Sequence, residues 1–278
     1  MSVVKFDVCS DLHLEFEWYW SQRSGVVVPE QGYYQSWFGR PKSPYLIIAG
    51  DLGVWSELEH GTRARMLLKD FHDWIAPQYN KVFYVLGNHD WWEHRLCSKT
   101  ITIFKSLYPN FVVLDCFDDP VVHIKKNLYM FGATLWSKIE RQRYAEYNMN
   151  DYRHILSSDE TDDVPIEPST TNAVNESSFN QLKTFVEGNR DKKIVVVTHH
   201  APSYKSQTEY KSCDDAYFNQ YDSWIEQQPN LLAWVHGHNH GLSYYMIGKT
   251  HVMCNPRGYV DVQPIADRFE LEQLTVAL

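Results

Sequence analysis

Five short polar clusters, each directly after an apolar run that favours a β-strand, constrain this chain more than any other feature. They are Asp11-Leu12-His13, Gly50-Asp51, Gly87-Asn88-His89-Asp90, Thr198-His199-His200 and Gly237-His238-Asn239-His240. Their carboxylate, amide and imidazole groups are donors that divalent transition metals prefer. None of the clusters contains a cysteine, so a structural zinc site is a poor fit. The set of donors predicts a hydrolytic site that holds two metal ions.

The clusters differ in how strongly each one indicates a metal site. A lone D-x-H or Gly-Asp motif is common in ordinary turns. The cluster 87–90 is more specific, because an amide oxygen can bind a metal while His89 faces the substrate and Asp90 orients that ring. In 237–240, two histidines at i and i+2 project the same way, which makes it the strongest single motif. The occurrence of all five at strand ends favours one shared site over five unrelated turns.

The apolar runs predict many short strands and few long helices. Strands are expected over 3–8, 45–49, 81–86, 111–114, 121–124, 128–135, 194–197, 232–235, 243–247, 251–254 and 269–276. Apolar residues at helical spacing indicate a helix over 57–75, and a second helix ends over 181–187. Helices alternate with strands early in the chain and hairpins dominate late, a pattern that two packed sheets with helices outside can accommodate.

We expect one domain spanning residues 1–278, because α/β enzymes often reach this length as a single unit. Two stretches read as insertions. The first, at about 15–44, is rich in aromatic residues and either covers the active site or packs on the outside; these are Trp18, Tyr19, Trp20, Tyr33, Tyr34, Trp37 and Phe38. The second, 157–178, is polar and acidic, which predicts a solvated loop.

Composition narrows the class of protein. The formal net charge of −9 argues against general nucleic-acid binding, although a local basic cleft stays compatible with it. Five cysteines without a CxxC pair favour a reduced intracellular protein. No signal peptide and no apolar stretch long enough to span a bilayer are evident. We therefore expect a cytoplasmic protein with no membrane partner, and the sequence indicates no particular oligomeric state.

In order and spacing, the five clusters resemble the calcineurin-like metallophosphoesterase superfamily, whose pattern is D-x-H, G-D, G-N-H-D/E, a lone His, then G-H-x-H. The resemblance extends from Asp11 to His240. It implies an α/β fold, a four-layer α-β-β-α sandwich of two mixed sheets flanked by helices. By position it implies one metal held by Asp11, His13 and His240, a second held by Asn88, His199 and His238, and Asp51 between them. His200 is the alternative to His199.

The resemblance specifies chemistry better than substrate. The sequences of 10–15, 132–136, 150–153 and 255–259 are similar to those of a bacterial-type subgroup of the superfamily. The core motifs, however, are shared by nucleases, cyclic-nucleotide phosphodiesterases and lipid-A precursor hydrolases. We expect hydrolysis of a phosphodiester in a small molecule or nucleotide by a hydroxide that bridges two metals. Asn88 and a protonated His89, held by Asp90, would assist catalysis. The alternatives are a nucleic-acid end-processing nuclease, a phosphomonoesterase and a non-catalytic scaffold.

The cofactors and the substrate contacts follow less directly. Mixed nitrogen and oxygen donors accept several ions, so we expect two divalent metals, with Mn or Fe first and Zn, Co or Ni also compatible. Arg153 and Arg257 are candidates to grip the phosphate of the ester substrate, the alternative being a salt bridge to an acidic residue. His200 is a further candidate for substrate contact, and His236 is expected to be structural or to support a ligand.

Overall fold

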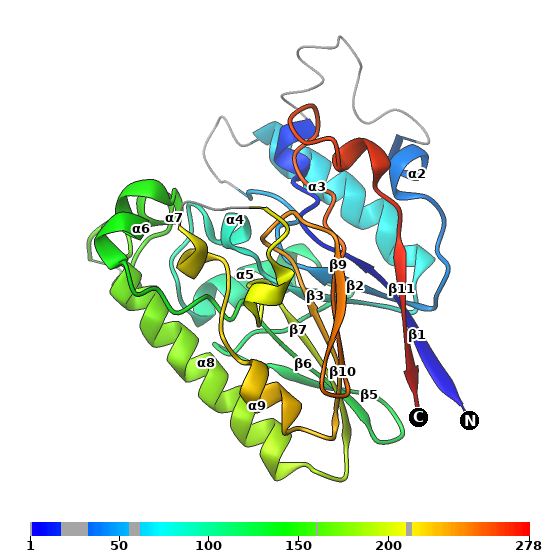
Figure 1. Ribbon diagram of the computed structural model, residues 1–278. Helices are drawn as coiled ribbons and strands as arrows, with labels where there is room; N and C mark the ends of the chain where they lie inside the picture. Colours follow the sequence, from blue (N-terminus) through cyan, green and yellow to red (C-terminus); the bar gives the residue numbers. More distant parts are fainter. Residues whose placement is uncertain (1, 18–32, 56–61, 160, 210–212) are drawn as a thin grey trace.

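The computed structural model of the protein describes residues 2–17, 33–55, 62–159, 161–209 and 213–278. Its strands form two sheets that pack against each other, with helices on both outer faces (Figure 1). This is the four-layer α/β sandwich of two mixed sheets that the sequence analysis predicted, and the fold prediction is confirmed.

The first sheet has five strands in the order β11-β1-β2-β3-β4. These are β11 (Glu272–Ala277), β1 (Val3–Cys9), β2 (Tyr45–Ala49), β3 (Lys81–Val85) and β4 (Phe111–Val113). The strands β1 to β4 are parallel, and β11 pairs with β1 in the antiparallel sense. Both β2 and β3 are buried beyond their first residue, as expected for parallel strands covered on two faces.

The second sheet has six strands in the order β5-β6-β7-β8-β10-β9. These are β5 (Val121–Lys125), β6 (Leu128–Ala133), β7 (Lys193–Thr198), β8 (Leu231–His236), β10 (Thr250–Cys254) and β9 (Ser243–Ile247). The four central strands are parallel, and the two edge strands are antiparallel to their neighbours. Both sheets are therefore mixed.

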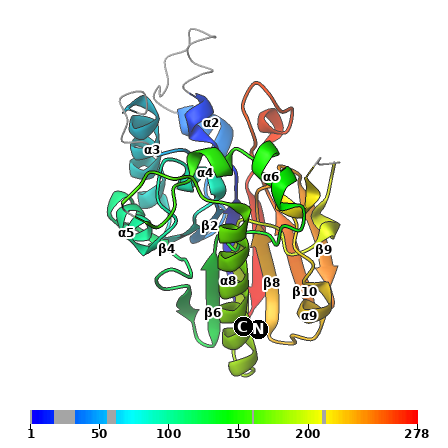
Figure 2. The same cartoon turned by 90° about the vertical axis from the view of Figure 1, so that its left-hand side faces the viewer.

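Three apolar layers hold the sandwich together. Between the sheets, residues such as Phe6 and Phe83 meet Met130 and Val195. Outside the first sheet lie α2 (Tyr33–Phe38), α3 (Thr62–Ile75) and α5 (Ser98–Leu107), and outside the second lie α8 (Pro168–Gly188) and α9 (Asp222–Glu226). Figure 2 shows α8 running along the outer face of the second sheet. Shorter helices are α4 (Asn88–Trp91), α6 (Gln142–Asn148) and α7 (Asp151–His154).

The interval 157–178 differs from its prediction as a solvated loop, because α8 begins at Pro168. Proline suits the first position of a helix, where its ring presets φ and its missing N–H costs nothing. The buried stripe of the first half of α8 is polar and includes Thr171 and Asn175. The amide of Asn175 donates to the carbonyls of Leu135 and Trp136 at 3.1 and 2.7 Å. Polar composition therefore hid a buried helix.

In the aromatic insertion at 15–44, the part that forms α2 packs on the outside of the first sheet, whereas Glu15 contacts His13 of the site. The ring of Trp37 stacks parallel to Phe71 of α3 with centroids 6.3 Å apart. Phe38 meets Trp74 edge to face at 5.6 Å. Trp18, Tyr19 and Trp20 lie outside the described residues.

Because parallel strands end at a common edge, the fold gathers the five polar clusters. They follow the carboxyl ends of β1, β2 and β3 in one sheet and of β7 and β8 in the other. These ends lie at the same end of the sandwich, beside α4 and α7 (Figure 1). Within the described ranges, no helix has the length and apolar character that crossing a bilayer demands. The cytoplasmic location stays a prediction.

Candidate metal centre

The loops after the strands turn back on themselves at the candidate ligands. Five of these residues have a left-handed backbone, with φ of 51° at Asp11, 45° at His13, 53° at Asp51, 72° at His238 and 49° at His240. Such a conformation costs a non-glycine residue on the order of 1–3 kcal/mol and persists only where its surroundings enforce it. Its concentration in these loops indicates that function, not loop stability, has set their shape.

Two glycines permit the close approach of these loops. A Cβ atom on Gly50 would lie 2.2 Å from Nδ1 of His199, and a Cβ atom on Gly87 would lie 2.1 Å from Oδ1 of Asp51. Neither distance is compatible with a side chain. The glycine of each motif is therefore required by the polar group opposite it.

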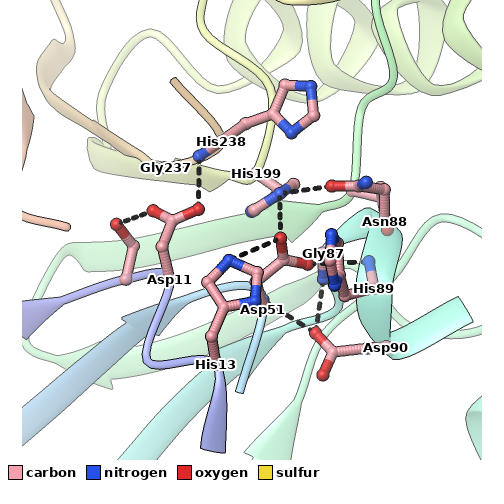
Figure 3. Close-up of polar contacts among 12 residues, drawn as sticks. Asp11, His13, Asp51, Gly87, Asn88, His89, Asp90, His199, Gly237 and His238 are labelled. Carbon is pink, nitrogen blue, oxygen red and sulfur yellow. Dashed lines mark hydrogen bonds and ion pairs between the residues drawn. The ribbon is translucent and has the colours of Figure 1, made fainter. Parts of the chain in front are cut away.

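The structure brings the predicted ligands into two groups that share one residue. Ligand atoms of Asp11, His13, Asp51 and His240 lie within 4.8 Å of one another, as do those of Asp51, His199 and His238. Oδ2 of Asp51 lies 3.5 Å from Nε2 of His13 and 3.3 Å from Nε2 of His199 (Figure 3). Oδ1 of Asn88 lies 3.0 Å from Nε2 of His199. A single carboxylate oxygen thus faces both groups.

The outer nitrogen of three rings is hydrogen-bonded to oxygen. Nδ1 donates to Glu15 Oε1 at 3.0 Å in His13, to the Ala49 carbonyl at 2.9 Å in His199, and to Gln263 Oε1 at 2.7 Å in His240. Each bond fixes the tautomer and leaves the Nε2 lone pair directed at the cluster.

The donor set fits divalent cations. Nε2 of His13 and Nε2 of His240 lie 3.0 Å apart, although both are lone-pair positions in the tautomers just described. Nε2 of His238 is buried without a hydrogen-bond partner. Lone pairs that converge without donors between them repel one another, and a cation at their centre removes that repulsion.

The local charges support the same interpretation. Burial alone would raise the pKa of Asp51, but the rings of His199 and His89 hold that pKa well below its usual range. Burial and the ring of His200 lower the pKa of His238 well below its usual range. An ionised carboxylate and a neutral imidazole are the forms that bind metal. Burial alone would lower the pKa of His199, but the charge of Asp51 raises it to about 9, so this ring gives up a proton when it binds a metal.

His89 is held by Glu15 and not, as predicted, by Asp90. Nδ1 of His89 donates to Oε1 of Glu15 at 3.1 Å, and the indole of Trp92 stacks on the ring with centroids 3.8 Å apart. Burial alone would lower the pKa of His89, but the charges of Asp51 and Glu15 raise it to about 9. The ring is therefore oriented, and its protonated form is favoured near neutral pH.

The carboxylate of Asp90 instead connects the loop after β2 with the loop after β3. It accepts from the backbone N–H groups of Asp51 at 2.8 Å, Gly53 at 3.3 Å and Gly87 at 2.7 Å. Figure 3 shows the bonds to Asp51 and Gly87. Burial and the charge of Asp51 raise the pKa of Asp90 to about 7. Asp90 thus shapes the backbone of the ligand loops, and its predicted catalytic contact with the His89 ring is wrong.

A cavity of about 180 Å³ opens beside the cluster. Its lining combines the predicted Asp51, Asn88, His89, His238 and His240 with Trp92, Asn148, Met149, Asn150, Asp151, Tyr217, Tyr259 and Gln263. Oδ1 of Asp151 accepts from Nδ2 of Asn88 at 2.8 Å, which turns Oδ1 of Asn88 toward His199. The Tyr217 ring stacks on His238 with centroids 4.6 Å apart.

Sequence reasoning did not assign roles to Glu15, Asp151, Tyr217 or Tyr259. The Tyr259 hydroxyl lies 3.5 Å from Nε2 of His89, at the limit of a hydrogen bond. Glu15 and Asp151 stand within the subgroup-like wording at 10–15 and 150–153, which was the one available signal. Tyr217 lies in no motif.

Neither arginine proposed for substrate contact lines the cavity. Arg257 is buried, pairs with Glu17 and lies 3.5 Å above the ring centroid of Trp37. Arg153 is exposed and donates to Oδ1 of Asn150 at 2.9 Å. The alternative left open for Arg257, a salt bridge, is the one observed, and the substrate role of both arginines is dropped.

The two remaining histidines lie beneath the cluster. The buried ring of His200 packs against His238 with centroids 4.1 Å apart, and His200 lies outside the cavity lining. Of the two alternatives, His199 is therefore the one placed beside Asp51. Nε2 of His236 bonds to the Ser206 hydroxyl at 2.7 Å, which agrees with a structural role.

Known proteins share both the sequence pattern and the fold. An uncharacterized protein (L509) of Acanthamoeba polyphaga mimivirus is 28% identical over 277 residues, covering 90% of this chain and 89% of the viral protein. The solved structure of phosphopantetheinyl hydrolase from Mycobacterium tuberculosis superimposes with a TM-score of 0.64 at 15% identity, over 97% of this chain and 95% of its own.

The family of this chain follows from its match to a defined protein family, which is more specific than overall similarity to single proteins. Residues 4–242, which include every predicted ligand, match the calcineurin-like phosphoesterases. Proteins of this family are metal-dependent, and the two groups of clustered donors meet that requirement here. The chain belongs to the calcineurin-like phosphoesterase family and is a metal-dependent phosphoric ester hydrolase.

Proposed function

We propose that this protein binds two divalent metal ions and hydrolyses phosphodiesters of small molecules or nucleotides. The observation that carries the proposal is the pair of donor groups joined at Oδ2 of Asp51 and facing the cavity. Asp11, His13 and His240 would hold one ion and Asn88, His199 and His238 the other, with Asp51 between them. Mn and Fe are the proposed ions, because the donors are mixed nitrogen and oxygen.

Metals bound in such a pair supply a water of lowered pKa and neutralise charge on the phosphate. The chain itself supplies the proton for the leaving group. His89 lines the cavity, and Glu15 on its Nδ1 keeps its Nε2 edge free for an ester oxygen. When the P–O bond breaks, the proton on Nε2 passes to the leaving oxygen, and Glu15 compensates the charge of the protonated ring beforehand.

The charge of the cavity wall supports a diester over a monoester. Beyond the residues proposed to hold the metals, Asp151 lines the cavity, and no lysine or arginine does so within the part of the chain that the structure describes. A phosphodiester carries one negative charge, whereas a monoester carries two near neutral pH. Nucleic acids, the second candidate, present a row of phosphates that basic residues usually neutralise. The observed lining favours a small substrate with a single charge.

The test is hydrolysis by metal-stripped protein refilled with Mn. We expect bis-p-nitrophenyl phosphate to be cleaved with a higher kcat/KM than p-nitrophenyl phosphate, and activity to be absent before metal is added. A screen of cyclic nucleotides, dinucleotides and phosphopantetheinyl esters would follow, the last because the structurally similar mycobacterial enzyme is a phosphopantetheinyl hydrolase. Monoester preference, or cleavage of single-stranded DNA at a comparable rate, would replace the proposal by one of its alternatives.

A further inference from the structure

The wall of the cavity beside Asn88 carries a carboxylate that is not among the proposed metal ligands and has no assigned catalytic role. Asp151, the first residue of α7, is 3% exposed and lines the cavity together with His89 and His238. Its Oδ1 accepts from Nδ2 of Asn88 and from Nε1 of Trp92, both at 2.8 Å. Both donors are neutral, so the hydrogen bonds orient the carboxylate, and the positive charge nearest to it on the cavity wall is that of the protonated His89 ring.

A charge in this position acts on the substrate. Two like charges repel each other more strongly in a buried site than in water, because less solvent screens them. A phosphate bound at Asn88 and His89 lies on the same wall as Asp151, since all three residues line one small cavity. Each additional negative charge on that phosphate is therefore penalised.

We propose that Asp151 is a specificity-determining residue that excludes phosphomonoesters and other phosphate dianions, so that the site takes phosphodiesters with a single negative charge. The inference rests on the proposed phosphodiesterase function and names the residue that creates its preference. A purely structural role for Asp151, as the acceptor that orients Asn88, is the competing explanation.

Two variants separate charge from hydrogen bonding. In Asp151→Asn, the amide oxygen still accepts from Asn88 and Trp92, but the negative charge is removed. In Asp151→Ala, both the acceptor and the charge are lost. Asp222→Asn is the matched control, because it removes a carboxylate that pairs with Lys205 and does not line this cavity.

The first experiment measures kcat/KM for p-nitrophenyl phosphate and bis-p-nitrophenyl phosphate with Mn-loaded protein. We expect Asp151→Asn to raise the monoester value about tenfold and the diester value about threefold, because the relieved repulsion is proportional to the charge of the substrate. Asp151→Ala should lower the diester value, because Asn88 loses its acceptor, while the ratio of the monoester value to the diester value rises as in Asp151→Asn. Asp222→Asn should leave both values unchanged. Equal changes for the two substrates in Asp151→Asn would assign Asp151 a structural role only and overturn the inference.

The second experiment does not depend on turnover. Calorimetric titration at pH 8 gives the Kd of inorganic phosphate, which is then a dianion, and of dimethyl phosphate, a monoanion. We expect Asp151→Asn to bind inorganic phosphate about tenfold more tightly than the wild type and dimethyl phosphate only about threefold more tightly, because the repulsion is proportional to the charge of the ligand. If the wild type hydrolyses no diester, the proposed function fails, yet this titration still decides whether Asp151 repels dianions. Unchanged phosphate affinity would refute that repulsion.

Discussion

Two buried histidines of the site, His89 and His200, have opposite electrostatic environments. On the side of the first sheet, His89 faces the carboxylates of Glu15 and Asp51, which raise its pKa to about 9. On the side of the second sheet, burial and the ring of His199 lower the pKa of His200 to about 3. The same side chain is thus prepared to donate a proton in one place and kept neutral in the other. Neighbouring charges, not residue type, decide which task a buried imidazole performs.

Asp51 serves both sides, so its loss tests whether they form one site. We expect Asp51→Asn to lower kcat about a thousandfold or more and to reduce the bound metal from two ions to at most one, because a shared anionic ligand is lost. Elemental analysis of the refilled protein, together with kcat for bis-p-nitrophenyl phosphate, measures both effects. Two ions bound at unchanged affinity would place the shared ligand elsewhere.

Removing His89 tests the side that donates a proton. We expect His89→Ala to lower kcat about 100- to 1,000-fold for a diester with a poor leaving group, the range typical of general acid catalysis. A diester of a strongly acidic phenol, which leaves without a proton, is the internal control and should lose far less. Metal content measured on the same sample should equal that of the wild type. Equal losses for both esters would remove His89 from the proton-transfer role.

The clustering of the candidate metal ligands could be predicted from the sequence because the information for it is local. A strand, a turn and a ligand within a few residues form a motif that can be recognised in the sequence. Parallel strands then bring such motifs to the same edge of the sheet. The cavity wall is different, since Glu15 and His89 are 74 positions apart and Asn88 and Asp151 are 63 apart. No spacing rule reports such pairs. Asp90 illustrates the error that follows, because its adjacency to His89 suggested a contact that the fold gives to Glu15.

Helix α8 was missed in part for a related reason. Its first half buries Thr171 and Asn175, whose polar groups find partners in distant loops. Composition alone predicts that a polar residue lies in solvent. Only the tertiary structure supplies the hydrogen bonds that offset the free-energy cost of burying its polar groups. The strands, by contrast, bury apolar residues and could be located from hydrophobicity alone.

Glu15 tests whether the proton-donating side depends on its carboxylate. We expect Glu15→Gln to lower kcat about tenfold for a poor leaving group and to steepen the dependence of rate on leaving-group pKa, because the protonated ring loses its compensating charge. The amide oxygen still accepts a hydrogen bond, so the ring orientation is retained. A Brønsted series of aryl diesters measures the slope. A uniform loss across the series would show that Glu15 acts only through the fold.

The smallest expected effect concerns the free energy of unfolding and the pH range in which His200 and His89 each contribute to it. In the metal-free protein, His200 has a folded-state pKa of about 3 against 6.5 in model compounds. The unfolded chain therefore takes up a proton that the folded chain refuses, and stability falls as the pH drops from about 6.5 toward 3. His89, with its raised pKa of about 9, contributes stability that is fully present below about 6.5 and lost as the pH rises to about 9.

A single substitution isolates the contribution of His200 to the loss of stability at acidic pH. We expect His200→Gln to remove up to about 1.4 kcal/mol per pH unit from the slope of the unfolding free energy between pH 6 and pH 4, since one proton is involved. Urea denaturation of both proteins in the presence of a chelator gives the two slopes. The substitution disturbs few hydrogen bonds, because Nδ1 of His200 is buried without a partner. Identical slopes would mean that His200 takes up its proton equally well in the folded and unfolded protein, and the contrast between His89 and His200 would then reduce to His89 alone.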